Sequence, residues 1–100
     1  MKRIALEDGR WFDQDKATAF DEDTWWDGRN DVSRATGSQF EHEVLYLTAG
    51  ERWVKHNWSQ WQGTSDVWEE IDPADAVRWL VVNGHEPHKG MDKDFSALEI

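Results

Sequence analysis

The feature that most constrains the fold is a long alternating stretch, QFEHEVLYLTAGERWVKHNWSQWQG, at residues 39–63. Successive side chains of a β-strand point to opposite faces, so residues 40–47 and 53–61 each divide into two sets. The segment TAGE lies between the two halves, and its Gly50 can take a positive φ without steric cost. The stretch therefore predicts an antiparallel hairpin over residues 40–62.

The same alternation separates the tryptophans of this hairpin. Trp53 and Trp61 fall on one face of their strand, whereas Trp58 points to the other. One exposed aromatic strip cannot hold all three unless a β-bulge intervenes. We therefore expect large rings to fill the core of this small domain, namely Trp53, Trp58, Trp68 and Trp79.

A helix over residues 73–83 is predicted by the signals at its two ends. Asp72 stands at the N-cap position, and Pro73 occupies the first helical position. Asn83-Gly84 is a C-terminal stop signal. Helical spacing predicts one apolar stripe, and Trp79 and Val82 lie off it. The stripe consists of Ala76, Val77, Leu80 and Val81.

The remaining chain supplies further short elements. Asp8-Gly9 predicts a turn between two strands, and SDVWEEID at residues 65–72 predicts another strand. Residues 14–20 fit a short helix capped by Asp13, although ATAF alternates and also fits a strand. We therefore predict an α+β fold, with one antiparallel sheet of four or five strands built from hairpins and packed by the C-terminal helix.

The domain is expected to span residues 1–86, followed by a tail at 87–100. After Pro87 the chain becomes polar, but its last residues include Phe95, Leu98 and Ile100. We expect these apolar side chains to fold back onto the domain, because termini without such anchors are usually the mobile ones. The alternative is an apolar hook for a partner.

Charge is the most informative property of the composition. Asp and Glu number 21 against 11 Lys and Arg, which gives a net charge of -10. An acidic surface repels phosphate, so direct binding to nucleic acid or to an anionic membrane is disfavoured. Partners are expected to be basic protein surfaces, unless the charge only keeps the protein soluble. Without cysteine, signal peptide or membrane-length apolar run, we expect a soluble cytoplasmic protein.

No arrangement of residues in the sequence identifies an active site. There is no nucleophile motif, and the H-x-x-H spacing of His85 and His88 is interrupted by Pro87. Paired carboxylates are frequent in any acidic chain and identify nothing without a pocket that shifts their pKa. We therefore expect neither catalytic residues, nor a metal, nor a cofactor, and a non-enzymatic role.

Trp25 and Trp26 are the tryptophans most suited to binding. They are adjacent, lie in an expected loop and follow several acids, and tryptophan is favoured at binding hot spots. A second acidic cluster follows residue 65. The candidate partner-binding residues are Asp21, Glu22, Asp23, Trp25, Trp26, Asp27, Asp66, Glu69, Glu70 and Asp75.

Four stretches of the chain together resemble a family of short bacterial, plasmid and phage proteins. They are LEDGRWFDQDKAT, TGSQFEHEVLYLT, WVKHNWSQWQG and EEIDPADAVRWLVVNG. The resemblance covers residues 4–86 and implies a shared layout, but no activity comes with it.

Two classes of function follow, with an uncharacterised enzyme in third place. The first is an interaction protein that docks on a basic protein surface. In its sharpest form it is an anti-defence or regulatory factor of a mobile element, whose carboxylates imitate nucleic-acid charge. The alternative is a module that binds a sugar or metabolite through Trp53, Asn57 and Trp61, which share one face.

Overall fold

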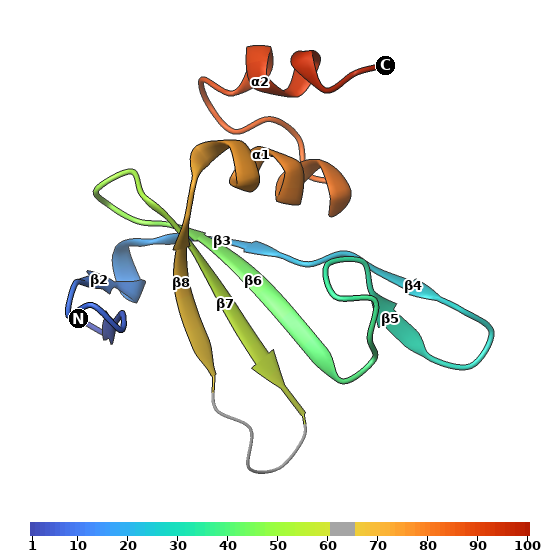
Figure 1. Cartoon of the computed structure of the whole chain (residues 1–100), viewed down its shortest axis with the longest axis horizontal. Helices are drawn as coiled ribbons and strands as arrows, with labels where there is room; N and C mark the ends of the chain where they lie inside the picture. Colours follow the sequence, from blue (N-terminus) through green and yellow to red (C-terminus); the bar gives the residue numbers. More distant parts are fainter. Residues whose placement is uncertain (61–65) are drawn as a thin grey trace.

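The computed structural model describes residues 1–60 and 66–100 and has an α+β fold (Figure 1). A four-stranded antiparallel sheet in the order β3–β6–β7–β8 consists of Thr18–Asp21, Glu41–Leu47, Trp53–Ser59 and Val67–Ile71. Two small hairpins are β1 (Arg3–Ala5) with β2 (Trp11–Asp13), and β4 (Thr24–Trp26) with β5 (Asp31–Ser33). The helices are the 3₁₀ turn η1 (Gln14–Lys16), α1 (Pro73–Val82) and α2 (Asp92–Ala97).

The central hairpin forms where it was predicted, and its paired residues share the faces that the alternation assigns to them. Leu47 pairs with Trp53, and His42 pairs with Trp58. The turn differs in one detail, because the positive φ of 61° belongs to Glu51 and not to Gly50. Thr48 closes this turn, since its carbonyl accepts from the Glu51 N–H and its hydroxyl from the Arg52 N–H.

The two faces of the sheet are covered by different parts of the chain. Residues of β6, β7, α1 and the segment before α2 form one core cluster: Leu45, Trp53, Ala76, Val77, Trp79, Leu80 and Met91. On the other face, the N-terminal hairpin packs Phe12 against Tyr46 and Val54. The sheet therefore lies between the helices and the β1–β2 hairpin, as Figure 1 shows.

Helix α1 has its predicted bounds to within a residue, but its buried face is rotated. Trp79 is 8% exposed, whereas Val81, which the predicted stripe included, is 44% exposed. A buried hydrogen bond explains this rotation. The Trp79 indole N–H donates to Glu43 Oε1 at 2.9 Å, which holds that side of the helix against the sheet. Asp72 has the extended N-cap backbone, but its side chain makes no capping hydrogen bond.

Residues 14–20 form both of the structures predicted for them as alternatives, a short helix first and then a strand. Asp13 caps the 3₁₀ turn by accepting from the Asp15 N–H, and the helix stops after Lys16. From Thr18 the chain is strand β3, because pairing with β6 satisfies its backbone and places Phe20 against Trp53. Tertiary pairing therefore ends the helix.

The segment at 87–100 folds back onto the domain. Met91 is 7% exposed and belongs to the core cluster under α1, and Phe95 of α2 packs against the same cluster. His88 also contacts the edge of the Phe20 ring, with the ring centroids 5.8 Å apart. This segment therefore contributes to the core. Of the three apolar residues predicted to fold back, Phe95 does so, whereas Leu98 is 43% exposed and Ile100 is fully exposed.

Replacing Glu51 by glycine should stabilise the protein by up to about 1 kcal/mol, because a side chain at positive φ is strained. A rise of about 5 °C in Tm is the expected reading by differential scanning calorimetry. Glu51→Ala is the control, since alanine removes the same charge but keeps the strained Cβ. An equal gain from alanine would contradict the backbone explanation.

Candidate functional site

The β4–β5 hairpin extends from the sheet (Figure 1), and it carries two exposed tryptophans. Trp25 is 43% exposed and Trp26 is 63% exposed. Trp25 pairs with Val32 and Trp26 with Asp31, so the two indoles lie on opposite faces of the hairpin. The sequence predicted a loop for these two tryptophans, but they lie in strand β4, because pairing with β5 satisfies their backbone groups.

The turn of this hairpin holds a charged carboxylate beside Trp26. Asp27 Oδ1 accepts hydrogen bonds from the backbone N–H groups of Asn30 and Arg29, each at 2.8 Å. These two bonds, with that from Asn30 the larger cause, lower the pKa of Asp27, so it is ionised at neutral pH. With Asp31 across the ladder, Trp26 has an acid on each side.

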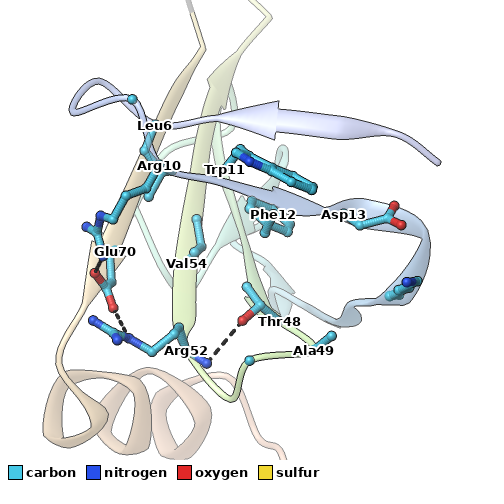
Figure 2. Close-up of a pocket in the computed structure, with 13 residues that line it drawn as sticks. Leu6, Arg10, Trp11, Phe12, Asp13, Thr48, Ala49, Arg52, Val54 and Glu70 are labelled. Carbon is cyan, nitrogen blue, oxygen red and sulfur yellow. Dashed lines mark hydrogen bonds and ion pairs between the residues drawn. The ribbon is translucent and has the colours of Figure 1, made fainter.

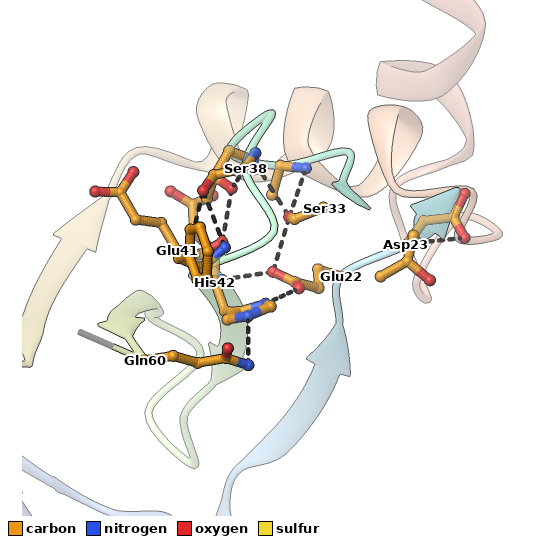
Figure 3. Close-up of polar contacts among 12 residues, drawn as sticks. Glu22, Asp23, Ser33, Ser38, Glu41, His42 and Gln60 are labelled. Atoms are coloured by element: carbon orange, nitrogen blue, oxygen red, sulfur yellow. Dashed lines mark hydrogen bonds and ion pairs between the residues drawn. The ribbon is translucent and has the colours of Figure 1, made fainter. Parts of the chain in front are cut away.

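The base of the hairpin is held by Glu22, whose side chain is only 12% exposed. Its Oε1 accepts from the Ser33 hydroxyl at 2.9 Å and from the Glu43 N–H at 2.7 Å. Its Oε2 accepts from His42 Nδ1 at 2.5 Å. Figure 3 shows how these contacts tie the hairpin to β6. Glu22 therefore positions the hairpin and offers little surface to a partner.

Asp23 connects the same base to the end of α1. Its N–H donates to Asn83 Oδ1 at 2.9 Å, while its carboxylate pairs with Arg34 Nε at 3.0 Å. Asn83 in turn donates to the Trp79 carbonyl at 2.8 Å. The base of the hairpin is thus hydrogen-bonded to β6 through Glu22 and to the end of α1 through Asp23.

A carboxylate–histidine pair such as Glu22–His42 can act as a general base in an enzyme, but the contacts of this pair are those of a structural link. The His42 ring stacks on Trp58 with centroids 4.4 Å apart, and its Nε2 lies 3.4 Å from Gln60 Nε2. Both ring nitrogens are therefore occupied. Within residues 1–60 and 66–100, no group of three or more His, Asp or Glu side chains could hold a metal ion.

Three of the other predicted acids lie at the far edge of the sheet. The hairpin follows edge strand β3, whereas Asp66, Glu69 and Glu70 lie in or beside β8 at the opposite edge. Asp66 pairs with His56 and Glu70 with two arginines, while Asp75 pairs with Arg78. Asp21 is exposed next to the hairpin. The structure therefore does not bring the two acidic clusters together.

The three residues of the alternative small-ligand site have different surroundings. Trp53 is 6% exposed in the core, and Asn57 donates to Glu43 Oε2 at 2.9 Å. Trp61 lies outside the described residues. A ring buried under α1 has no face to offer a ligand. Trp53 and Asn57 are therefore structural residues of the fold.

Several anchoring residues were not predicted from the sequence, among them Ser33, Glu43 and Asn83. For Glu43 a signal existed, because the alternation places its carboxylate on the same face as Leu45. Nothing in the sequence marks Ser33 as fully buried.

The described helices are all too short or too polar to cross a membrane. The chain matches no protein-family model, no curated protein sequence and no solved structure.

Proposed function

We propose that this protein is an interaction module that docks its β4–β5 hairpin on a basic protein surface. The observation that carries the proposal is the pair of adjacent exposed indoles, Trp25 and Trp26, at the tip of a rigidly anchored acidic hairpin. An exposed tryptophan buries a large area on binding at low entropic cost, and such residues dominate interface energies.

The surroundings of Trp26 favour a cationic partner. An arginine or lysine of the partner can lie over the indole while it pairs with Asp27 or Asp31, which combines a cation–π contact with a charge-assisted hydrogen bond. The net charge of -10 adds long-range attraction that speeds association and weakens with salt.

The basic surfaces best suited to this chemistry are those that hold nucleic acid. A mobile-element anti-defence or regulatory factor that occupies such a surface is our specific proposal. Its carboxylates would stand in for backbone phosphates, so the protein and a DNA duplex should compete for the same nuclease.

Trp26→Ala should weaken binding to a synthetic Arg/Gly-repeat peptide by roughly 30-fold, the loss typical of a hot-spot tryptophan. Binding is measured by titrating ¹⁵N-labelled protein and following amide shifts. Trp11→Ala is the matched control, because Trp11 is 52% exposed on the other small hairpin. If the two variants lose affinity equally, the β4–β5 hairpin is not the docking element.

The charge component is tested by the double variant Asp27→Asn/Asp31→Asn. We expect weaker binding and a shallower dependence on salt concentration. Its control is Asp92→Asn/Asp94→Asn, which removes two exposed acids from α2. Affinity that does not change with salt, or an equal effect of the α2 pair, would refute the basic partner.

A further inference from the structure

A cavity of about 650 Å³ lies between the β1–β2 hairpin and the turn that joins β6 to β7 (Figure 2). Leu6, Phe12 and Val54 form its apolar wall, and the last two are 7% and 2% exposed. Small-molecule sites commonly measure about 300 to 1,000 Å³ and combine such walls with a few polar groups. The cavity has the dimensions of a ligand site.

The charges that line this cavity reverse the balance of the whole chain. Among its described lining residues, Arg10, Lys16 and Arg52 outnumber Asp13 and Glu70. The chain overall carries 21 acidic residues against 11 Lys and Arg. The lining of the cavity is therefore much less acidic than the chain as a whole.

Glu70 holds the two arginines in place at the cavity. Its Oε1 lies 2.6 Å from Arg10 Nη1, and its Oε2 lies 2.5 Å from Arg52 Nε (Figure 2). Hydrogen bonds from Arg52 and then Arg10 lower the pKa of Glu70, so this carboxylate is ionised at neutral pH. Arg10 also pairs through its Nε with Asp8 Oδ2 at 2.8 Å, so two carboxylates hold the two guanidinium groups and the donors of Arg10 are engaged on both sides.

These cations keep donors free for a ligand. Within the described part of the chain, the Nη groups of Arg52 and the ammonium of Lys16 have no hydrogen-bond or ion-pair partner. Because Glu70 already fixes the Arg52 guanidinium, an anion that binds there costs less side-chain entropy than at a free arginine.

We propose that this cavity binds a small organic anion. Its apolar body lies against Phe12 and Val54, and its carboxylate or phosphate accepts hydrogen bonds from Arg52 and Lys16. The proposal is independent of the β4–β5 hairpin, which extends from the opposite end of the sheet.

The test uses three probes that share one ring system: 1-naphthaleneacetate, 1-naphthyl phosphate and 1-naphthylmethylammonium. Titrated into ¹⁵N-labelled full-length protein, at least one of the two anions should shift the backbone amides of Ala49 and Gly50, which line the cavity. The cation should leave them unchanged. The anion with the higher affinity distinguishes a carboxylate ligand from a phosphate ligand.

Arg52→Ala should weaken the binding of that anion by roughly tenfold or more, the loss expected for a charge-assisted hydrogen bond. Arg78→Ala is the matched control, because both side chains are 62% exposed and each pairs with an acid. A dispersed amide spectrum for each variant verifies that it is folded.

The proposal fails if neither anion shifts these amides, if the cation shifts them equally, or if the two arginine variants lose the same affinity. Each of these results leaves the docking proposal untouched, because its peptide titration is read at Trp25 and Trp26.

Discussion

Replacing Glu43 by alanine will lower the free energy of unfolding by about 3 to 5 kcal/mol, the range measured when one partner of a buried ion pair is removed. Glu43 is 8% exposed between the sheet and α1. Its carboxylate accepts from Trp79 Nε1 and Asn57 Nδ2, each at 2.9 Å, and lies 3.7 Å from Lys55 Nζ. Alanine leaves all three donors without this acceptor in a buried site.

Two variants separate this explanation from a general effect of mutating β6. Glu41→Ala removes an exposed carboxylate from the same face of the same strand and should change stability by less than about 0.5 kcal/mol. Glu43→Gln keeps an acceptor for Trp79, so its free energy of unfolding should lie between those of the two alanine variants. Urea denaturation followed by circular dichroism measures all three, and equal losses for Glu41→Ala and Glu43→Ala would contradict the assignment.

Glu22→Ala is expected to cost about 3 kcal/mol, because it leaves the Ser33 hydroxyl and the Glu43 N–H without their acceptor. Ser33 is fully buried, so water cannot easily replace the lost carboxylate. The β4–β5 hairpin should also lose its fixed attachment, with broadened amide signals at Trp25 and Trp26. Urea denaturation and ¹⁵N relaxation measure the two effects.

The control for Glu22 is its neighbour Asp21, an exposed residue at the end of β3. The Asp21 carboxylate makes no hydrogen bond or ion pair within the described residues. Its backbone pairs with Val44 and its carbonyl accepts from His85 Nε2 at 2.7 Å, and Asp21→Ala keeps both. This variant should therefore retain both stability and sharp hairpin signals. If Asp21→Ala broadens the amide signals of the hairpin as much as Glu22→Ala does, the hairpin is held by negative charge near β4 and not by the contacts of Glu22.

The parts of the fold that the sequence predicted are those set by local rules. Alternation between residues 40 and 62 was sufficient to predict the hairpin and the faces of the described part of β6 and β7. The end signals of α1 were sufficient for its bounds to within a residue. Asp8-Gly9 marks a turn, and Gly9 there has a positive φ. Each of these patterns depends on neighbours a few residues apart.

The errors arise where a distant contact decides the local outcome. The side of α1 that is buried depends on Glu43, which lies 36 residues from Trp79 in the chain. The left-handed residue of the β6–β7 turn is Glu51, because the bonds to Thr48 set the geometry of that turn.

The candidate site was predicted only in part. Adjacent tryptophans among acids predicted exposed rings at Trp25 and Trp26, and both are exposed, but they lie in strand β4 and not in the expected loop. The sequence could not show that Glu22 is an internal anchor, because a run of acids reads as surface charge. Nor could it gather Arg10, Lys16 and Arg52 around one cavity, since that requires the packing of the first hairpin on the sheet.

The β4–β5 hairpin leaves the sheet after β3 and returns before β6, and the strands on either side of it remain paired with each other. Insertions, deletions or substitutions at its tip can therefore accumulate without shifting any residue pair of the scaffold. For the interaction module proposed above, this arrangement would let the docking tip change while the paired strands of the body stay the same.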